Sequence, residues 1–247
     1  MFPAPIEPAP ALCQKHREPR WESPVSRNQV LIGIVVLALL VLGGAAWYVL
    51  GSGSGDSTTL SPGGGNGMTT ATADDRTLGN PKAPITVIEY AAPMCPHCAH
   101  MNEEGIPVLK AQYIDPGKVF YIFRVFPIGQ ADIAAESIAR CLPADKYFQF
   151  IDLLYRNQAK WDPENGITDV HGGLVAMGRI AGLSGDQVDQ CIADKGVQKH
   201  TMDVAQDAST RYGVTGTPTF VINGEVQTPG APWPDIKAKL DSLLAKK

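Results

Sequence analysis

The hydrophobic pattern of the chain begins with one long apolar run. Residues 30–50, VLIGIVVLALLVLGGAAWYVL, carry no charged side chain. A helix of this length rises about 30 Å, which is the hydrocarbon thickness of a bilayer. Trp47 and Tyr48 lie near its end, where amphipathic rings favour the membrane interface. The pattern therefore predicts a single transmembrane helix at 30–50.

The second half of the chain alternates between strand-like and helix-like patterns. Apolar, β-branched runs predict strands at 85–90, 119–126, 219–222 and 225–227, the last two joined by the hairpin turn Asn223-Gly224. The segments between them predict helices at 99–113, 132–141, 144–158, 170–181, 186–193, 197–212 and 235–245, with Pro107 expected to kink the first. This order predicts an α/β domain with an inserted helical subdomain at about 130–205.

The charges around the apolar run predict its orientation. Basic residues precede it, whereas residues 51–75 contain no lysine or arginine. The positive-inside rule then leaves the N-terminus in the cytoplasm and the rest of the chain outside. Gly44-Ala45-Ala46 offers a possible cleavage site, but the run is longer than a usual signal-peptide core. An uncleaved single-pass anchor is therefore favoured.

The segments on either side of the predicted anchor do not resemble folded domains. Residues 51–75 are rich in Gly, Ser and Thr and cannot bury enough apolar surface to offset their ordering entropy, which predicts a flexible linker. Residues 1–29 are expected to form a disordered cytoplasmic tail. The folded domain is therefore predicted to span 76–247.

Composition places the chain among globular proteins and gives no reason to expect a nucleic-acid partner. The chain is 44% hydrophobic and 19% charged, with a net charge of −4, so no basic surface suggests a nucleic-acid partner. Cys13 lies in the cytoplasmic tail and is interpreted as an incidental free thiol. The other cysteines lie in the predicted extracytoplasmic domain, where disulfide chemistry is expected: Cys95, Cys98, Cys141 and Cys191.

The most informative motif is Cys95-Pro96-His97-Cys98, at the junction between a predicted strand and a predicted helix. The N–H groups and dipole at a helix N-terminus favour a thiolate at Cys95, and His97 can add a positive charge or a hydrogen bond. Cys95 is therefore expected to be the attacking sulfur in thiol–disulfide exchange, and Cys98 the buried thiol that resolves the mixed disulfide.

Two segments of the domain together resemble the DsbA family of thiol–disulfide oxidoreductases. VIEYAAPMCPHC resembles the family's active-site strand and motif, and TGTPTFVING resembles the loop that carries its cis-proline, which would be Pro218. The resemblance covers 76–247. It implies a thioredoxin-like fold with a helical insertion and disulfide transfer without a cofactor.

The resemblance also implies roles for further residues. Glu89 would be buried beneath the cysteines and assist proton transfer, although an edge-strand residue facing water is the alternative. Pro218, if cis rather than trans, would place the backbone of Thr217 beside the cysteines. Thr217 departs from the valine preferred by the best-known oxidases, which leaves an isomerase or reductase open. Some relatives carry a second disulfide, so Cys141 and Cys191 are expected to be bridged, with two buried thiols as the alternative.

Partners follow from the resemblance and the predicted anchor. The expected substrates are reduced, unfolded exported proteins, and the expected oxidant is a quinone-linked membrane protein resembling DsbB. The catalytic domain is expected on the periplasmic side of the inner membrane as a monomer, since the linker shows no dimerisation domain. Met94 and Trp233 are candidates to line a substrate groove.

Other kinds of site fit the motif less well. Haem attachment requires a histidine directly after the second cysteine, where this chain has Ala99. A structural zinc site needs further ligands that the sequence does not supply. Copper binding through Cys95, Cys98 and His100 stays an alternative, although His100 is expected to be an ordinary surface residue.

Overall fold

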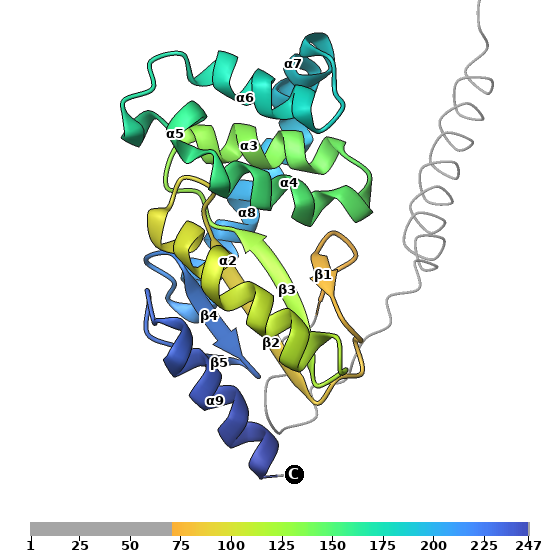
Figure 1. Cartoon of the computed structure of the whole chain (residues 1–247), viewed down its shortest axis with the longest axis vertical. Coiled ribbons are helices and arrows are strands. Elements are labelled where there is room, and N and C mark those ends of the chain that lie inside the picture. Colours follow the sequence, from red (N-terminus) through yellow and green to blue (C-terminus); the bar gives the residue numbers. More distant parts are fainter. Residues whose placement is uncertain (1–70, 247) are drawn as a thin grey trace, which may run out of the picture. The chain divides into compact units, whose positions relative to one another are not determined.

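The computed structural model describes residues 71–246 (Figure 1). The predicted tail at 1–29, the predicted transmembrane helix at 30–50 and most of the predicted linker lie outside these residues. Within 71–246, no helix combines the length and the apolar character needed to cross a membrane.

A five-stranded sheet forms the centre of the domain, in the order β1-β3-β2-β4-β5. Its strands are β1 (Arg76–Leu78), β2 (Ile85–Ala91), β3 (Val119–Val125), β4 (Thr219–Ile222) and β5 (Glu225–Val226). β2 and β3 pair in parallel, and the other pairs are antiparallel. The middle strand β2 is buried along nearly its whole length, which agrees with its apolar, β-branched sequence.

Helices cover both faces of this sheet (Figure 1). Ile85 and Val87 of β2 share one cluster of buried side chains with α2 (Pro96–Leu109) and α9 (Trp233–Ala245). Ile88 and Tyr90 point to the other face, where they pack with residues of α8 (Lys195–Tyr212). Because side chains alternate along a strand, Glu89 points to the same face as Val87, beneath α2.

The helical insertion stacks at the end of the sheet (Figure 1). It contains α3 (Gln130–Cys141), α4 (Tyr147–Arg156), α5 (Gln158–Trp161), α6 (Val170–Ile180) and α7 (Gly185–Ala193), and α8 leads back to the sheet. Cys141 at the end of α3 and Cys191 in α7 form a disulfide with an S–S distance of 2.07 Å. The predicted fold class, an α/β thioredoxin-like fold with a helical insertion, is confirmed.

Some local predictions differ from the structure. The predicted helix at 144–158 is a 3₁₀ turn at Ala144–Lys146 followed by α4 and α5, because Asn157 leaves the helical region with φ −122° and ψ 21°. Pro107 lies inside α2, and a π-helical turn at Lys110–Ile114 continues the helix. The short strand β1 was not predicted.

The start of the folded unit also differs from the predicted boundary at residue 76. Asp75, assigned to the flexible linker by composition, accepts hydrogen bonds from the Arg124 guanidinium at 2.7 and 2.8 Å. Ala71 packs against the buried cluster on the α8 face of the sheet. Residues 71–75 are therefore part of the fold, because their partners lie on strands that composition cannot reveal.

Candidate active site

Cys95 occupies the N-cap position of α2, with Pro96 in the first turn of the helix. The Cys95 sulfur accepts a hydrogen bond from the backbone N–H of Cys98 at 3.4 Å. Proline suits the first turn because it has no N–H to leave unpaired. The CxxC segment is therefore a helix start in which a sulfur takes the place of the usual capping oxygen.

The environment of Cys95 stabilises its thiolate. The pKa of Cys95 is lowered to about 5, chiefly by a hydrogen bond with the Cys98 side chain, against the opposing effect of burial. The Thr217 side chain and the backbone N–H groups of Cys98 and His97 lower the pKa further. The backbone of His97 contributes to this shift, and its side chain is exposed.

Cys98 and Glu89 are buried beneath Cys95 and favour their neutral forms. Burial raises the pKa of the Cys98 thiol well above its ordinary value, and the Cys95 thiolate raises it further. Burial also raises the pKa of Glu89 to about 7, although a hydrogen bond from the Tyr121 hydroxyl at 2.5 Å opposes the shift. Glu89 lies on the middle strand and is 2% exposed, which excludes the edge-strand alternative.

The loop before β4 lies beside the cysteines. The Thr217–Pro218 peptide bond is cis. The Thr217 carbonyl oxygen lies 3.4 Å from the Cys95 sulfur and can accept an S–H hydrogen bond from the thiol form. The structure therefore brings together the two motifs on which the sequence resemblance rests.

The helical insertion holds the active-site loop through residues that the sequence analysis did not identify. The buried Asp132 carboxylate, in the first turn of α3, accepts hydrogen bonds from the backbone N–H groups of Met94, Ile128 and Gly129. The Gln158 side-chain amide donates to the carbonyl oxygens of Pro93 and Cys95. An acid in the first turn of a predicted helix is a sequence signal for Asp132, whereas no local signal marks Gln158.

Other candidate residues lie outside this arrangement. His100 pairs with Glu104 on the surface of α2 at 3.3 Å. Met94 lines an apolar cavity together with Ile128 and Leu174. Trp233 instead packs near Gly105 and the Tyr113 ring and does not line this cavity.

Metal binding has no geometric support in the part of the chain that the structure describes. Among residues 71–246, no three His, Cys, Asp or Glu side chains gather as a metal site would require. The alternative copper set of Cys95, Cys98 and His100 is not among such groups in these residues, and His100 pairs with Glu104.

The arrangement can carry out two-electron thiol chemistry. It combines a stabilised thiolate at a helix start, a buried neutral thiol one turn later and a buried carboxyl beneath them. This site on this sheet defines a dithiol protein of the thioredoxin fold.

Comparison with known proteins places the chain more narrowly. A family model described as Thioredoxin matches residues 71–242, so the chain belongs to the thioredoxin family. The crystal structure of Wolbachia pipientis α-DsbA1 matches with a TM-score of 0.65 and 29% identity, over 71% of this chain and 94% of that one. Within the family, the chain groups with the DsbA-like proteins.

Two curated relatives carry related names. A protein of Rickettsia typhi named as a protein-disulfide oxidoreductase is 31% identical over 69% of this chain, and the match spans only 62% of the Rickettsia protein. A Bacillus cereus protein named as disulfide bond formation protein D is 28% identical over 90% of this chain and 99% of its own length.

Proposed function

We propose that this protein is a thiol–disulfide oxidoreductase that introduces disulfides into exported proteins through the Cys95–Cys98 pair. The observation that carries the proposal is the opposite ionisation of the two sulfurs. Cys95 has its pKa lowered to about 5, whereas burial raises the pKa of Cys98 well above its ordinary value. A stabilised thiolate favours the dithiol form, which makes the disulfide form a better oxidant.

The reaction transfers two electrons from a substrate dithiol to the enzyme disulfide. A substrate thiolate attacks the Cys95 sulfur, forms a mixed disulfide and releases Cys98 as a thiolate, which takes a proton. The second substrate thiolate then attacks the substrate sulfur of the mixed disulfide and releases Cys95 as a thiolate. Because Cys95 leaves as a stable anion, this second step proceeds near neutral pH.

Substrate contact is proposed at two features beside Cys95. The backbone of Thr217 lies against the sulfur and is placed to meet an extended substrate chain. The apolar cavity lined by Met94, Ile128 and Leu174 has a volume of about 530 Å³ and can accept apolar side chains of an unfolded protein. Such contacts suit substrates that share exposed apolar segments rather than one sequence.

The cellular setting is also part of the proposal. The uncharged run at 30–50 supports a single-pass anchor in the inner membrane, with the catalytic domain on the periplasmic side. Reoxidation of the dithiol needs an electron acceptor, and we assign this role to a quinone-linked membrane oxidase resembling DsbB. An anchored enzyme would stay close to such a partner.

The test uses the oxidised full chain and a reduced, unfolded substrate that contains several cysteines. The unaltered protein should form substrate disulfides, and Cys95→Ala should abolish this activity because no sulfur remains to be attacked. His100→Ala is the matched control, since His100 lies on the same helix but pairs with Glu104 at the surface. Equal activity in the unaltered protein and the Cys95→Ala variant would refute the proposal.

Thr217 favours a second candidate, a disulfide isomerase or reductase, because it departs from the valine of the best-known oxidases. A disulfide donor and a reductase differ in the reduction potential that the Cys95–Cys98 pair must have. A potential near that of strong oxidants, about −120 mV, supports disulfide donation, whereas one near about −270 mV supports a reductase. The measurement is an equilibrium titration against glutathione.

A further inference from the structure

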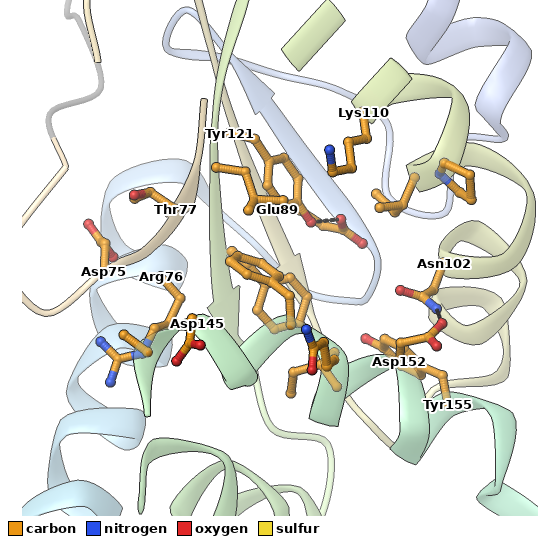
Figure 2. Close-up of a pocket in the computed structure, with 18 of the residues that line it drawn as sticks. Asp75, Arg76, Thr77, Glu89, Asn102, Lys110, Tyr121, Asp145, Asp152 and Tyr155 are labelled. Atoms are coloured by element: carbon orange, nitrogen blue, oxygen red, sulfur yellow. Dashed lines mark hydrogen bonds between the residues drawn. The ribbon is translucent and has the colours of Figure 1, made fainter. Parts of the chain in front are cut away.

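A large cavity lies between α2, α4 and the sheet (Figure 2). Its volume is about 790 Å³, within the range of about 300–1,000 Å³ that is usual for small-molecule sites. Much of its wall is apolar, and β1, α2, β3 and α4 supply these side chains: Leu78, Ile106, Pro107, Phe123, Phe148 and Ile151. The cavity therefore has the size and the apolar wall of a site for a small organic molecule.

Arg76 and Tyr155 line this cavity, and each has a buried polar side-chain atom. In the part of the chain that the structure describes, the Arg76 Nε and the Tyr155 hydroxyl have no hydrogen-bond partner. The Tyr155 side chain is only 5% exposed. Because a buried polar group without a partner costs free energy, such groups indicate where a bound molecule completes a site. Two of them on one cavity point to a ligand that carries polar groups of its own.

Arg76 differs from the other basic residues that line the cavity in how its charge is paired. Lys110 and Arg156 each form a salt bridge with a carboxylate. Within residues 71–246 the Arg76 guanidinium forms no salt bridge, and it lies over the Tyr147 ring, 5.3 Å from the ring centroid. Asp145 also lines the cavity, but its side chain is exposed to solvent. A ligand carboxylate can therefore pair with Arg76 without displacing an existing partner.

The polar groups lie at the two ends of the cavity, and aromatic rings lie between them. Figure 2 shows Arg76 at one end and Tyr155 at the other, with Tyr121 between them. The Phe148 ring contacts the Tyr121 and Phe123 rings, with centroid distances of 6.2 Å in both cases. Aromatic rings favour tilted and edge-to-face contacts with further rings. The cavity thus offers a cation at one end, aromatic surface in the middle and a hydroxyl at the other end.

We propose that this cavity binds a small aromatic carboxylic acid that has a second polar group at its far end. The ligand carboxylate pairs with the Arg76 guanidinium, the ring packs against Phe148, and the far polar group forms a hydrogen bond with the Tyr155 hydroxyl. A purely apolar ligand would leave both buried polar atoms without a partner, and a cationic ligand would be repelled by Arg76. The inference goes beyond the proposed function, because this binding needs no thiol chemistry.

The first experiment compares three probes by isothermal titration calorimetry on the full chain. The acid 3-(4-hydroxyphenyl)propionate should bind with a Kd of about 1 mM or tighter, the ordinary range for a small ligand. Its carboxamide should bind about tenfold more weakly, because it cannot form the ion pair with Arg76. The acid 3-phenylpropionate should bind about fivefold more weakly, because it lacks the hydroxyl that meets Tyr155. Absence of binding at millimolar concentration, or equal affinity for the acid and its carboxamide, would overturn the proposal.

Two variants assign the ends of the ligand to the ends of the cavity. Arg76→Gln should weaken binding of the hydroxylated acid about tenfold and leave binding of its carboxamide unchanged. Tyr155→Phe should weaken binding of the hydroxylated acid about fivefold and leave binding of 3-phenylpropionate unchanged. A general packing defect would instead weaken all three probes alike. Such a uniform loss in both variants would show that neither side chain recognises the ligand.

The matched controls remove the same chemical groups elsewhere. Arg156→Gln removes a guanidinium that lines the cavity but already pairs with Asp152 at 2.8 Å. Tyr113→Phe removes a hydroxyl that bonds Asp241 on α9, outside the cavity. Neither control should change the Kd of the hydroxylated acid by more than about twofold, because an exposed ion pair contributes little. A larger loss in Arg156→Gln than in Arg76→Gln would mean that the carboxylate binds at the other end, contrary to the proposal.

Discussion

Cys95 and Glu89 lie close together and have pKa values shifted in opposite directions. The pKa of Cys95 falls to about 5, whereas burial raises that of Glu89 to about 7. The lowered pKa of Cys95 stabilises the folded dithiol form at pH values above the ordinary thiol pKa. This contribution is lost as pH falls through about 5. The raised pKa of Glu89 stabilises the fold at pH values below the ordinary carboxyl pKa. This contribution is lost as pH rises through about 7.

These ionisation states predict how the reduction potential depends on pH. Above about pH 8, reduction of the disulfide should take up one proton, at Cys98, because Cys95 remains a thiolate and Glu89 is ionised. The potential should then fall by about 30 mV per pH unit. Below about pH 5, Cys95 also takes up a proton, and the slope should double to about 60 mV per pH unit.

Equilibration with glutathione or dithiothreitol across this pH range measures the slope. Glu89 titrates near 7, so its own titration affects the slope between about pH 5 and about pH 8. The Glu89→Gln variant removes this titration and serves as a control. A constant slope of about 60 mV per pH unit up to pH 8 would mean that Cys95 is an ordinary thiol, contrary to this expectation.

At the scale of elements, the helical insertion positions the active-site loop. The first turn of α3 supplies Asp132, and the start of α5 supplies Gln158. Together they bind backbone groups of Pro93, Met94 and Cys95, immediately before α2. The insertion is therefore part of the active site and not merely a covering layer.

This arrangement predicts a large loss of stability in Asp132→Ala. The Asp132 carboxylate is fully buried and serves three backbone N–H groups, which would lose their acceptor. Each unsatisfied buried group costs about 1–3 kcal/mol, so we expect the free energy of unfolding to fall by at least about 2–3 kcal/mol in urea titrations.

The matched control is Asp169→Ala, which removes an exposed carboxylate that caps α6 by accepting from Gly172 N–H. Loss of an ordinary N-cap costs about 1 kcal/mol. A loss in Asp132→Ala no greater than in Asp169→Ala would show that Asp132 acts only as a helix cap and does not hold the loop.

Sequence patterns predicted the elements whose signals are local. The strand at 85–90 is a continuous apolar run, and the structure has β2 at Ile85–Ala91. The helix predicted at 197–212 appears as α8 at Lys195–Tyr212, which ends at Gly213 in the left-handed conformation. β1 was missed because three residues carry too short a pattern, and its pairing with β3 depends on residues about 45 positions away.

The same distinction applies to the site. Cys95, Cys98 and Pro218 stand in short motifs that can be identified from sequence. Tyr121 and Tyr155 approach Glu89 and the cysteines only when β3 pairs with β2 and α4 packs against α2, because neither residue stands in a motif. Their tyrosine side chains resemble ordinary core aromatics in the sequence, and only the cavity next to Glu89 distinguishes them.

At the scale of the whole molecule, a buried ion pair ties the start of the fold to the sheet. Asp75 and Arg124 have side-chain exposures of only 5% and 10%. Arg124 also donates to the Tyr90 hydroxyl at 3.0 Å, which links the pair to β2. Burial raises the pKa of Asp75, but hydrogen bonds from Arg124 and Thr72 outweigh burial and leave it below its ordinary value.

Asp75→Asn should therefore lower the free energy of unfolding by about 3–5 kcal/mol, since removing one partner of a buried ion pair leaves the other charge uncompensated. Asp74→Asn is the matched control, because the neighbouring Asp74 side chain is exposed. The lowered pKa of Asp75 means that its stabilisation is present above its ordinary value and is lost only as pH falls through the lowered pKa. The difference between the two variants should thus persist at neutral pH and shrink in strong acid. Equal stabilities of the two variants at neutral pH would mean that Asp75 belongs to the flexible linker and that the fold starts at β1.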